Sequence, residues 1–325
     1  MSQPIDVSIL VPTFRRPDLL KRCLTSILTA IPCNQERFEV VLGDDSVDAA
    51  INASVLAEFS SRWGGLYTYL LHSPNLGQQR NFNVLLQHAQ GRFIQFLHDD
   101  DYFLNGAGQA FLDATRMPDA TAVPVKFGVW LVTQDGRHKR SESPSRKRRL
   151  SPRESVRLMI SESSYVRFPA MFVPRSIYEV MGFFDSSHGF IADLALWLRM
   201  ARAYGLRELP ICTTAYTIHE GAGTSTMFTY AFIAKIYSLL DDYADFATDN
   251  KKEANLLIGK FMWRFVLAGQ FRALRTKKWS SLQERVELAN CKEMRHLPCP
   301  PRWVGLRAGF WLAQKLFAPM GKLSS

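Results

Sequence analysis

A regular alternation in the first third of the chain constrains the fold most strongly: short β-branched or aromatic runs alternate with longer amphipathic stretches. This pattern is typical of βαβ units, in which helices cover a parallel sheet. The short runs predict strands at residues 7–12, 38–42, 67–71 and 93–97. A chain of 325 residues is long enough to bury the core of one α/β domain and of a smaller appendage.

The later part of the chain becomes increasingly helical. We expect helices at 49–63, 107–115, 175–181 and 194–204, and helical periodicity dominates from residue 227 onward. This predicts one α/β domain over residues 1–225 and a helical C-terminal region over 226–325. Within the α/β domain, the segment 137–150 is rich in Ser, Pro, Lys and Arg, and we expect it to be a mobile basic loop.

Polar residues follow each predicted strand. They are Thr13-Phe14-Arg15-Arg16, Asp44-Asp45-Ser46, Ser73-Pro74-Asn75 and His98-Asp99-Asp100-Asp101. Open parallel sheets bind ligands in the crevice beyond the carboxyl ends of their strands. The sequence therefore predicts a ligand site of nucleotide size at this edge of the sheet.

Four separated motifs stand in order along the chain. They are VSILVPTFRRPDLL, FEVVLGDDS, FIQFLHDDDYF and FFDSSHGFIADLALWLRMA. Together they resemble the inverting family 2 glycosyltransferases with the GT-A fold, and the resemblance covers about residues 5–225. It implies a Rossmann-like, mostly parallel central sheet with flanking helices. It also implies a nucleotide-binding half at about 1–118 and an acceptor half at about 119–225.

Three consecutive aspartates follow the fourth predicted strand. A hard divalent cation requires carboxylate oxygens, and a sugar nucleotide brings two phosphates to share it. The resemblance implies that Asp99 contacts the ribose and that Asp100, with Asp101, holds Mg²⁺ or Mn²⁺. His98 stands where many members of the family have an aspartate. A capping or solvated acidic turn is the alternative interpretation.

The resemblance also implies a nucleotide-binding set: Pro12, Thr13, Arg15, Asp44, Asp45, Arg80 and Asp99. Asp44 or Asp45 resembles a base-recognition site, in which a carboxylate accepts a hydrogen bond from an imide N–H of uracil or guanine. Helix capping is the alternative for this pair. Arg80 resembles an arginine that faces the nucleotide, and a surface salt bridge is its alternative.

Two further residues resemble positions with chemical roles in the family. Asp193 resembles the general base that takes the proton from the acceptor hydroxyl, with Asp185 as the fallback and a simple N-cap as the alternative. His219, beside a glycine-rich segment, resembles a position where histidine approaches the metal or the diphosphate. A structural histidine is equally compatible with this pattern.

The expected activity is therefore metal-dependent transfer of a sugar, from a UDP-sugar first of all, to a glycan or lipid-linked acceptor in cell-surface glycan biosynthesis. A sugar-1-phosphate nucleotidyltransferase ranks lower, because the first strand ends PTFRRPDLL, without the glycine-rich loop that binds a triphosphate. The alternative from another class is a basic module that binds nucleic acid or a membrane surface and retains a vestigial nucleotide site.

The formal net charge of +10 suits any anionic partner and does not choose among them. Nucleic acid is not expected, since no aromatic residue interrupts the basic run between Lys139 and Arg149. The segment 302–317 predicts a helix with aromatic and cationic residues, which would either lie on an anionic membrane or pack on the catalytic domain. With no predicted signal peptide or spanning segment, we expect a cytoplasmic protein, peripheral on the inner face of the membrane.

Overall fold

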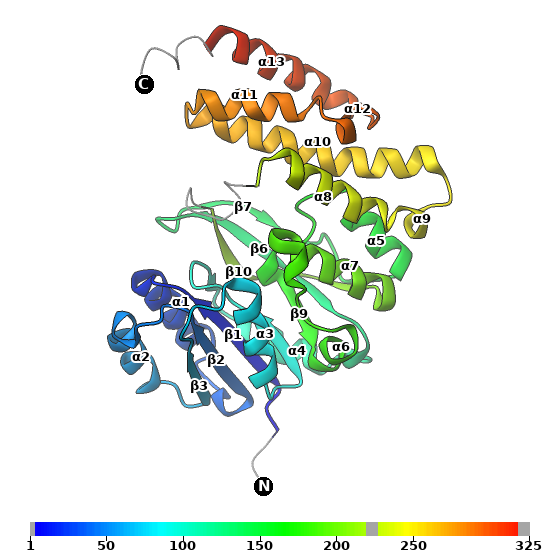
Figure 1. The fold of residues 1–325 in the computed structure, drawn as a ribbon. Helices are drawn as coiled ribbons and strands as arrows, with labels where there is room; N and C mark the ends of the chain where they lie inside the picture. The colour runs from blue at the N-terminus through cyan, green and yellow to red at the C-terminus, as the bar shows by residue number, and fades with distance from the viewer. Residues whose placement is uncertain (1–3, 219–226, 318–325) are drawn as a thin grey trace. The chain divides into compact units, whose positions relative to one another are not determined.

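The computed structural model describes residues 4–218 and 227–317, which fall into two compact units. The sheet unit comprises residues 4–152 and 166–218, and the helical unit comprises residues 153–165 and 227–317 (Figure 1). The division expected from the sequence puts residues 153–165 in the first domain, whereas in the structure they group with the helical unit.

The sheet unit is built on a mixed sheet with the strand order β3-β2-β1-β4-β9-β6-β10-β5, in which β7 pairs with β6 and β8 with β10. The strands are β1 (Val7–Thr13), β2 (Phe38–Asp44), β3 (Leu66–Leu71), β4 (Phe93–Phe96), β5 (Tyr102–Phe103), β6 (Val125–Thr133), β7 (His138–Glu142), β8 (Arg148–Leu150), β9 (Met171–Pro174) and β10 (Leu206–Ile218). The neighbours β3, β2, β1 and β4 are parallel, and β9 runs antiparallel to β4 and β6. The predicted α/β class is confirmed, with its parallel strands concentrated in the first third of the chain.

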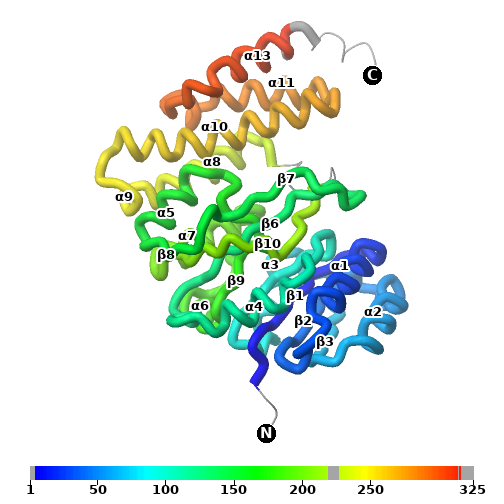
Figure 2. The backbone as a smooth tube through the Cα atoms, turned by 180° about the vertical axis from the view of Figure 1, so that it is seen from behind, coloured from blue at the N-terminus to red at the C-terminus, as the bar shows by residue number. Residues whose placement is uncertain are grey.

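Helices cover both faces of this sheet (Figures 1 and 2). They are α1 (Pro17–Ala30), α2 (Ala53–Ser60), α3 (Gln78–His88), α4 (Ala107–Thr115), α6 (Arg175–Met181) and α7 (Ala192–Tyr204). The helices α1, α2 and α4 share a core with Val7, Ile9 and Val11 on one side of β1, and α3 packs on the opposite face. Because both faces are covered, the successive residues Ile9, Leu10 and Val11 of β1 are all apolar and buried, and they do not alternate with exposed polar residues.

The basic segment 137–150 is not the mobile loop that its composition predicts. It contributes β7, which pairs with β6, and β8, which pairs with β10. Arg148 Nε lies 2.5 Å from Glu208 Oε2 on β10, and Arg149 makes an ion pair with Asp119. These carboxylates are distant in sequence, so local composition could not reveal that the cations have partners.

The helical unit contains α5 (Pro152–Met159, apart from its first residue), α8 (Tyr230–Asp241), α9 (Ala244–Ala247), α10 (Lys251–Arg275), α11 (Trp279–Leu288), α12 (Lys292–Arg295) and α13 (Pro301–Phe317). The second half of α10 packs against α11 and α13 around Leu267, Leu282 and Phe310. The helix predicted at 302–317 is therefore present as α13. Within the described residues, no helix combines the length and the apolar character that crossing a bilayer requires.

A stacked aromatic group in the sheet unit gives a direct test of this core. Phe172 is fully buried, and its ring centroid lies 5.0 Å from that of Phe93 and 5.2 Å from that of Phe111. Phe172→Ala should lower the free energy of unfolding by about 3–5 kcal/mol, because it leaves a cavity that its neighbours cannot fill. Urea denaturation followed by circular dichroism measures this change.

The matched control is Val180→Ala on α6, whose side chain is 69% exposed. This variant should stay within about 0.5 kcal/mol of the unsubstituted protein. Equal losses for the two variants would mean that Phe172 does not lie in the core.

Candidate active site

Polar side chains from separate strands meet at the carboxyl edge of the sheet unit. Asp99, which follows β4, accepts a hydrogen bond from Thr13 Oγ1 at the end of β1 over 2.8 Å and one from the Phe14 backbone N over 3.4 Å. Asp101 Oδ1 accepts a hydrogen bond from the Thr217 backbone N on β10 over 2.8 Å. The strand ends singled out in the sequence therefore lie in one cluster.

Asp99 is buried beside other charged groups. Burial, with the nearby negative charge of Asp100, raises the pKa of Asp99 to about 6. Arg16 Nη1 lies 3.4 Å from Asp99 Oδ1 and 3.3 Å from Asp100 Oδ2, and so partly offsets this repulsion. The neighbouring Arg15 is exposed, and its backbone N donates to Ser46 Oγ over 2.8 Å. Of the two arginines after β1, the structure thus brings Arg16 to the aspartates.

His98, Asp100 and Asp101 form a cluster in which one possible ligand atom from each lies within 4.8 Å of the others. Asp101 Oδ2 and His98 Nε2 are both buried and have no hydrogen-bond partner among the described residues. Burial, and then the charge of Asp100, raise the pKa of Asp101. A buried carboxylate oxygen with no partner is costly, and a divalent cation would satisfy it. The donor set of these residues, two carboxylates and an imidazole, therefore fits a divalent cation.

His98 was not identified as a ligand candidate from the sequence. Its ring stacks with Phe82 at a centroid distance of 5.4 Å and lies 4.5 Å from the ring of Phe168. Burial lowers the pKa of His98, so its imidazole is neutral at pH 7 and can offer a lone pair. The sequence signal was its position directly before Asp99. The predicted ligand His219 lies outside the described residues.

Arg22 on α1 is a second residue that the sequence analysis missed. Its Nη2 donates to the Asp100 carbonyl over 2.5 Å and to Thr217 Oγ1 over 3.1 Å. The guanidinium also lies 4.9 Å from the centroid of the Tyr102 ring. Arg22 therefore fixes the turn that carries the aspartates against the end of β10.

The two carboxylates at the end of β2 are already engaged within the protein. Asp44 is fully buried and accepts hydrogen bonds from Asn52 Nδ2 over 2.7 Å and from the Tyr69 hydroxyl over 3.0 Å. Asp45 accepts from the backbone N of Leu76 over 2.7 Å and of Gly77 over 2.8 Å. Asp44 therefore organises the end of β2, and Asp45 holds the loop that precedes α3. Neither carboxylate caps α2, whose N-cap is Asn52.

The remaining members of the predicted nucleotide-binding set lie around this edge. Pro12 is in β1, opposite Gly43 of β2, and is partly exposed. Arg80 is exposed in the first turn of α3. It has no hydrogen bond or ion pair to any residue in the ranges 4–218 and 227–317, so the surface salt bridge considered for it is absent there.

Asp193 lies within a helix and does not cap one. α7 begins at Ala192 with Ile191 as its N-cap, and Asp193 Oδ1 accepts from the Leu194 backbone N over 2.7 Å. Burial raises the pKa of Asp193 to about 6. Asp185, the fallback base, instead caps a short 3₁₀ helix through Ser187, and that hydrogen bond lowers its pKa. Of these two carboxylates, Asp193 is thus the one poised to exchange a proton near neutral pH.

Tyr216 on β10 is sensitive to the charges of both Asp193 and the acidic cluster, and no sequence motif pointed to it. Burial raises the pKa of Tyr216 to about 12, against the effect of Arg167, and the carboxylates of Asp101, Asp100 and Asp193 each add to the rise. All three carboxylates therefore act on the same hydroxyl. Asp193 and the acidic cluster, which come from distant parts of the chain, therefore both influence this side chain.

The segment before α7 is tied to α3. Asn83 Nδ2 donates to the Phe184 carbonyl over 2.8 Å, and the Phe184 backbone N donates back to Asn83 Oδ1 over 3.0 Å. Gln79 Nε2 donates to the Gly189 carbonyl over 2.9 Å. These three bonds hold the residues that lead into Asp193 against the helix that carries Arg80.

Comparison with known proteins identifies related sequences. A family profile described as glycosyl transferase family 2 matches residues 8–179. The uncharacterized protein MT1568 of Mycobacterium tuberculosis is 37% identical over 105 residues, which are 32% of this chain and 30% of that protein. The GalNAc(5)-diNAcBac-PP-undecaprenol beta-1,3-glucosyltransferase of Campylobacter jejuni is 32% identical over 132 residues, 40% of each protein. This chain thus spans less than half of the length of the curated relatives that it matches.

Solved structures share the architecture at low sequence identity. S. aureus TarS in complex with UDP-GlcNAc has a TM-score of 0.63 and 18% identity, covering 90% of this chain and 82% of that one. The mannosyltransferase PcManGT from Pyrobaculum calidifontis, in complex with GDP-Man and Mn²⁺, has a TM-score of 0.51 and 15% identity, covering 97% and 88%. The expected GT-A fold is confirmed.

The hydrogen bonds of Asp44 predict a structural role that can be measured. Asp44→Ala leaves the Asn52 amide and the Tyr69 hydroxyl without their acceptor, so it should lower the free energy of unfolding by about 2–5 kcal/mol. The control is Asp48→Ala, an exposed residue nearby that accepts one bond, from the Ala50 backbone N, and should lose about 1 kcal/mol or less. Similar thermal unfolding of the two variants would contradict the structural role of Asp44.

Proposed function

Because the chain belongs to glycosyl transferase family 2, we propose that it is an inverting glycosyltransferase, which moves a sugar from a nucleoside diphosphate to an acceptor hydroxyl. One observation carries the proposal: His98, Asp100 and Asp101 gather after β4 at the carboxyl edge of the sheet, where Asp101 Oδ2 and His98 Nε2 are buried without hydrogen-bond partners among the described residues. This cluster is assigned to the donor side, and Asp193, whose charge acts on Tyr216 together with those of Asp100 and Asp101, is assigned as the base. The acceptor oxygen attacks the anomeric carbon as the bond to the diphosphate breaks, which inverts that carbon without a covalent enzyme intermediate.

We assign the donor to the edge formed by β1, β2 and β4. Asp99 contacts the ribose, while Pro12, Thr13 and Arg15 border the nucleotide. Both carboxylates after β2 are buried and hydrogen-bonded, and we assign Asp45 to the base because it is 4% exposed whereas Asp44 is 0% exposed. Arg80 is available for phosphate or a base edge, since it has no partner among the described residues. UDP-sugars are the first donors to test, as TarS was solved with UDP-GlcNAc.

The cluster of His98, Asp100 and Asp101 is assigned to a divalent cation. The two buried ligand atoms without partners, His98 Nε2 and Asp101 Oδ2, support this assignment. Mn²⁺ accompanies GDP-Man in the structure of PcManGT. When bound, such an ion would neutralise charge on the leaving diphosphate. Arg22, through the Asp100 carbonyl, keeps the turn that bears these ligands in position.

Asp193 is assigned as the general base that receives the proton of the acceptor hydroxyl. Its raised pKa supports the assignment, since a carboxylate with a pKa of about 6 is a stronger base than an ordinary aspartate and is still ionised at pH 7. The hydrogen bond from the Leu194 backbone N orients Oδ1. The other oxygen of Asp193 would then face the acceptor.

For the acceptor we propose a lipid-linked glycan of the cell surface, which would bring the enzyme to the inner face of a membrane. The support is the Campylobacter relative, whose name includes an undecaprenol diphosphate. This assignment is separate from the donor chemistry and can fail without it.

The donor and metal assignments are tested by calorimetric titration of UDP, GDP and dTDP in the presence of Mn²⁺ or Mg²⁺. One diphosphate should bind in a metal-dependent way, and Asp101→Asn should weaken its binding by about 100-fold or more, because the cation loses a charged ligand. Asp113→Asn, a 58% exposed carboxylate on α4, is the control and should bind normally. If none of the three binds to the folded protein, a nonenzymatic binding module becomes the better description.

The base assignment predicts a pH dependence. Protonation of Asp193 removes the base, so kcat/KM should be constant above pH 7 and fall about tenfold per pH unit below about 6. Asp193→Asn should lower kcat by about 10²–10⁴-fold while the donor still binds. Steady-state rates across pH measure both effects.

Two further variants separate the carboxylates that titrate in this range. Asp193→Glu should move the midpoint of the pH profile, whereas an unchanged midpoint would assign the titration to Asp99. Asp185→Asn should retain activity. If Asp185→Asn were inactive and Asp193→Asn active, Asp185 would be the base.

A further inference from the structure

The net positive charge of the protein comes from one part of the chain. Residues 1–253 contain 27 Lys and Arg and 27 Asp and Glu, whereas residues 254–325 contain 13 and 3. The formal net charge of +10 therefore resides entirely in 254–325. In the structure, 254–317 form the greater part of the helical unit and include most of α10 as well as α11, α12 and α13.

Helix α13 exposes apolar side chains in this basic region. Its inner side packs on α10 and α11 through Trp303, Phe310 and Ala313. Its other sides carry Val304, Leu306, Trp311 and Leu312, which are 46–53% exposed. No Asp or Glu follows Glu293 in the sequence, so α13 contains none. An exposed helix with aromatic and aliphatic residues and only cationic charge is typical of a surface that binds at a membrane interface.

Cations flank these apolar side chains. The Arg302 guanidinium lies 4.7 Å from the centroid of the Trp303 ring, and the Lys315 ammonium lies 3.9 Å from that of Trp311. Long cationic side chains that lie along apolar surface can leave their charge among lipid headgroups while the rings enter the acyl region. The two contacts give α13 this arrangement near each of its ends.

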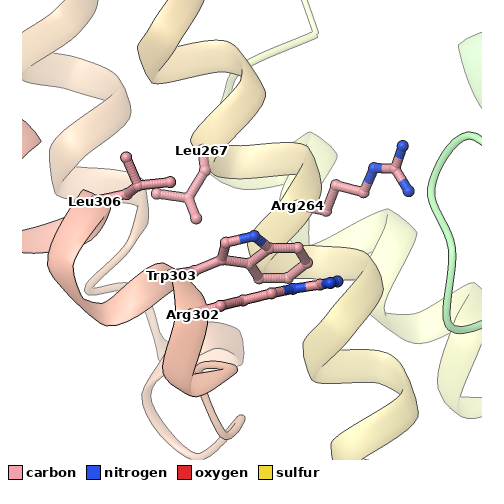
Figure 3. Close-up of a pocket in the computed structure, with 5 residues that line it drawn as sticks. All are labelled: Arg264, Leu267, Arg302, Trp303 and Leu306. Carbon is pink, nitrogen blue, oxygen red and sulfur yellow. The ribbon is translucent and has the colours of Figure 1, made fainter.

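A pocket of about 390 Å³ opens between α10 and α13, lined by Arg264, Leu267, Arg302, Trp303 and Leu306 (Figure 3). The two guanidinium groups lie on one side, and Leu267 and Leu306 on the other. Within the described ranges, neither arginine makes an ion pair with a carboxylate. The pocket therefore offers two free cations to a phosphate and an apolar wall to an attached chain.

The turn after α10 adds further exposed cations to the helical unit. Phe271 is 59% exposed, and Arg275, Lys277 and Lys278 follow it with exposed side chains. In both views of the chain, the end of α10 and the end of α13 lie at the same end of the helical unit (Figures 1 and 2). These cations add to the net positive charge of the helical unit.

We propose that the outward side of α13 docks on an anionic phospholipid bilayer, with Val304, Trp311 and Leu312 in the interface and the flanking cations Arg302 and Lys315 among the lipid headgroups. Charge decides among the possible occupants. A second copy of the chain would bring another strongly positive face against this one, and the exposed aliphatic side chains Val304, Leu306 and Leu312 offer a nucleic acid neither charge nor a stacking ring, so they favour lipid over nucleic acid. The proposal concerns the helical unit alone and does not depend on the proposed activity.

The experiment is co-sedimentation of the full chain with vesicles of phosphatidylcholine, with and without phosphatidylglycerol. The protein should bind the anionic vesicles, bind the neutral ones at least tenfold more weakly, and dissociate as the salt concentration rises. Arg302→Ser with Lys315→Ser should weaken binding about thirtyfold, since each cation near the surface contributes. Trp311→Ser with Leu312→Ser should weaken it about tenfold or more at unchanged charge.

The matched control is Arg146→Ser with Lys147→Ser, which removes the same charge from an exposed part of the sheet unit and should bind as the unsubstituted protein does. Three outcomes would overturn the proposal. The first is an equal loss of binding in the control and in the α13 variants. The second is that the protein binds poly(U) and does not bind vesicles. The third is that the protein does not bind vesicles but self-associates in sedimentation analysis, and that Trp311→Ser with Leu312→Ser abolishes this self-association.

Discussion

The carboxylate of Asp99 joins the ends of two parallel strands, and the geometry of the site depends on this contact. Its bond to Thr13 fixes β4 against β1 where both strands end. The turn that follows then brings Asp100 and Asp101 towards β10, where Thr217 and Arg22 hold it. The negative charges gathered there repel one another, and the raised pKa of Asp99 reflects both this repulsion and burial. The fold thus holds in place a cluster that a cation would stabilise.

Local sequence patterns predicted much of the fold. The runs that became β1, β2 and β4 are apolar because both faces of the sheet are covered, and α4 and α6 span the predicted residues. The helix expected over 49–63 is shorter, since a 3₁₀ turn (Ala49–Ile51) precedes α2. The strands in 137–150 were missed because their cations pair with Glu208 and Asp119, which are distant in sequence. Periodicity does not report such pairing.

In the candidate site, too, local motifs were visible in the sequence, whereas contacts between distant residues were not. The aspartates after β4 were visible as a motif, because consecutive carboxylates after an apolar strand have few structural uses. Arg22 and Tyr216 were not visible, since each acquires its role only when α1 or β10 packs beside the acidic turn. His98 had a signal in its position, but its burial between Phe82 and Phe168, which favours the neutral imidazole, required the structure. Motifs predicted the groups that would touch a ligand, and packing determined those that position them.

The three hydrogen bonds between α3 and the segment before α7 have a consequence for the order of events in catalysis. Asn83 and Gln79 form hydrogen bonds to Phe184 and Gly189, so the first two turns of α3 are directly linked to the segment that leads to Asp193, the proposed base. A donor that immobilises Arg80 would also immobilise the acceptor side and reduce the entropy that the second substrate must lose. This linkage favours compulsory-order kinetics, with the nucleotide sugar entering first and the nucleoside diphosphate leaving last.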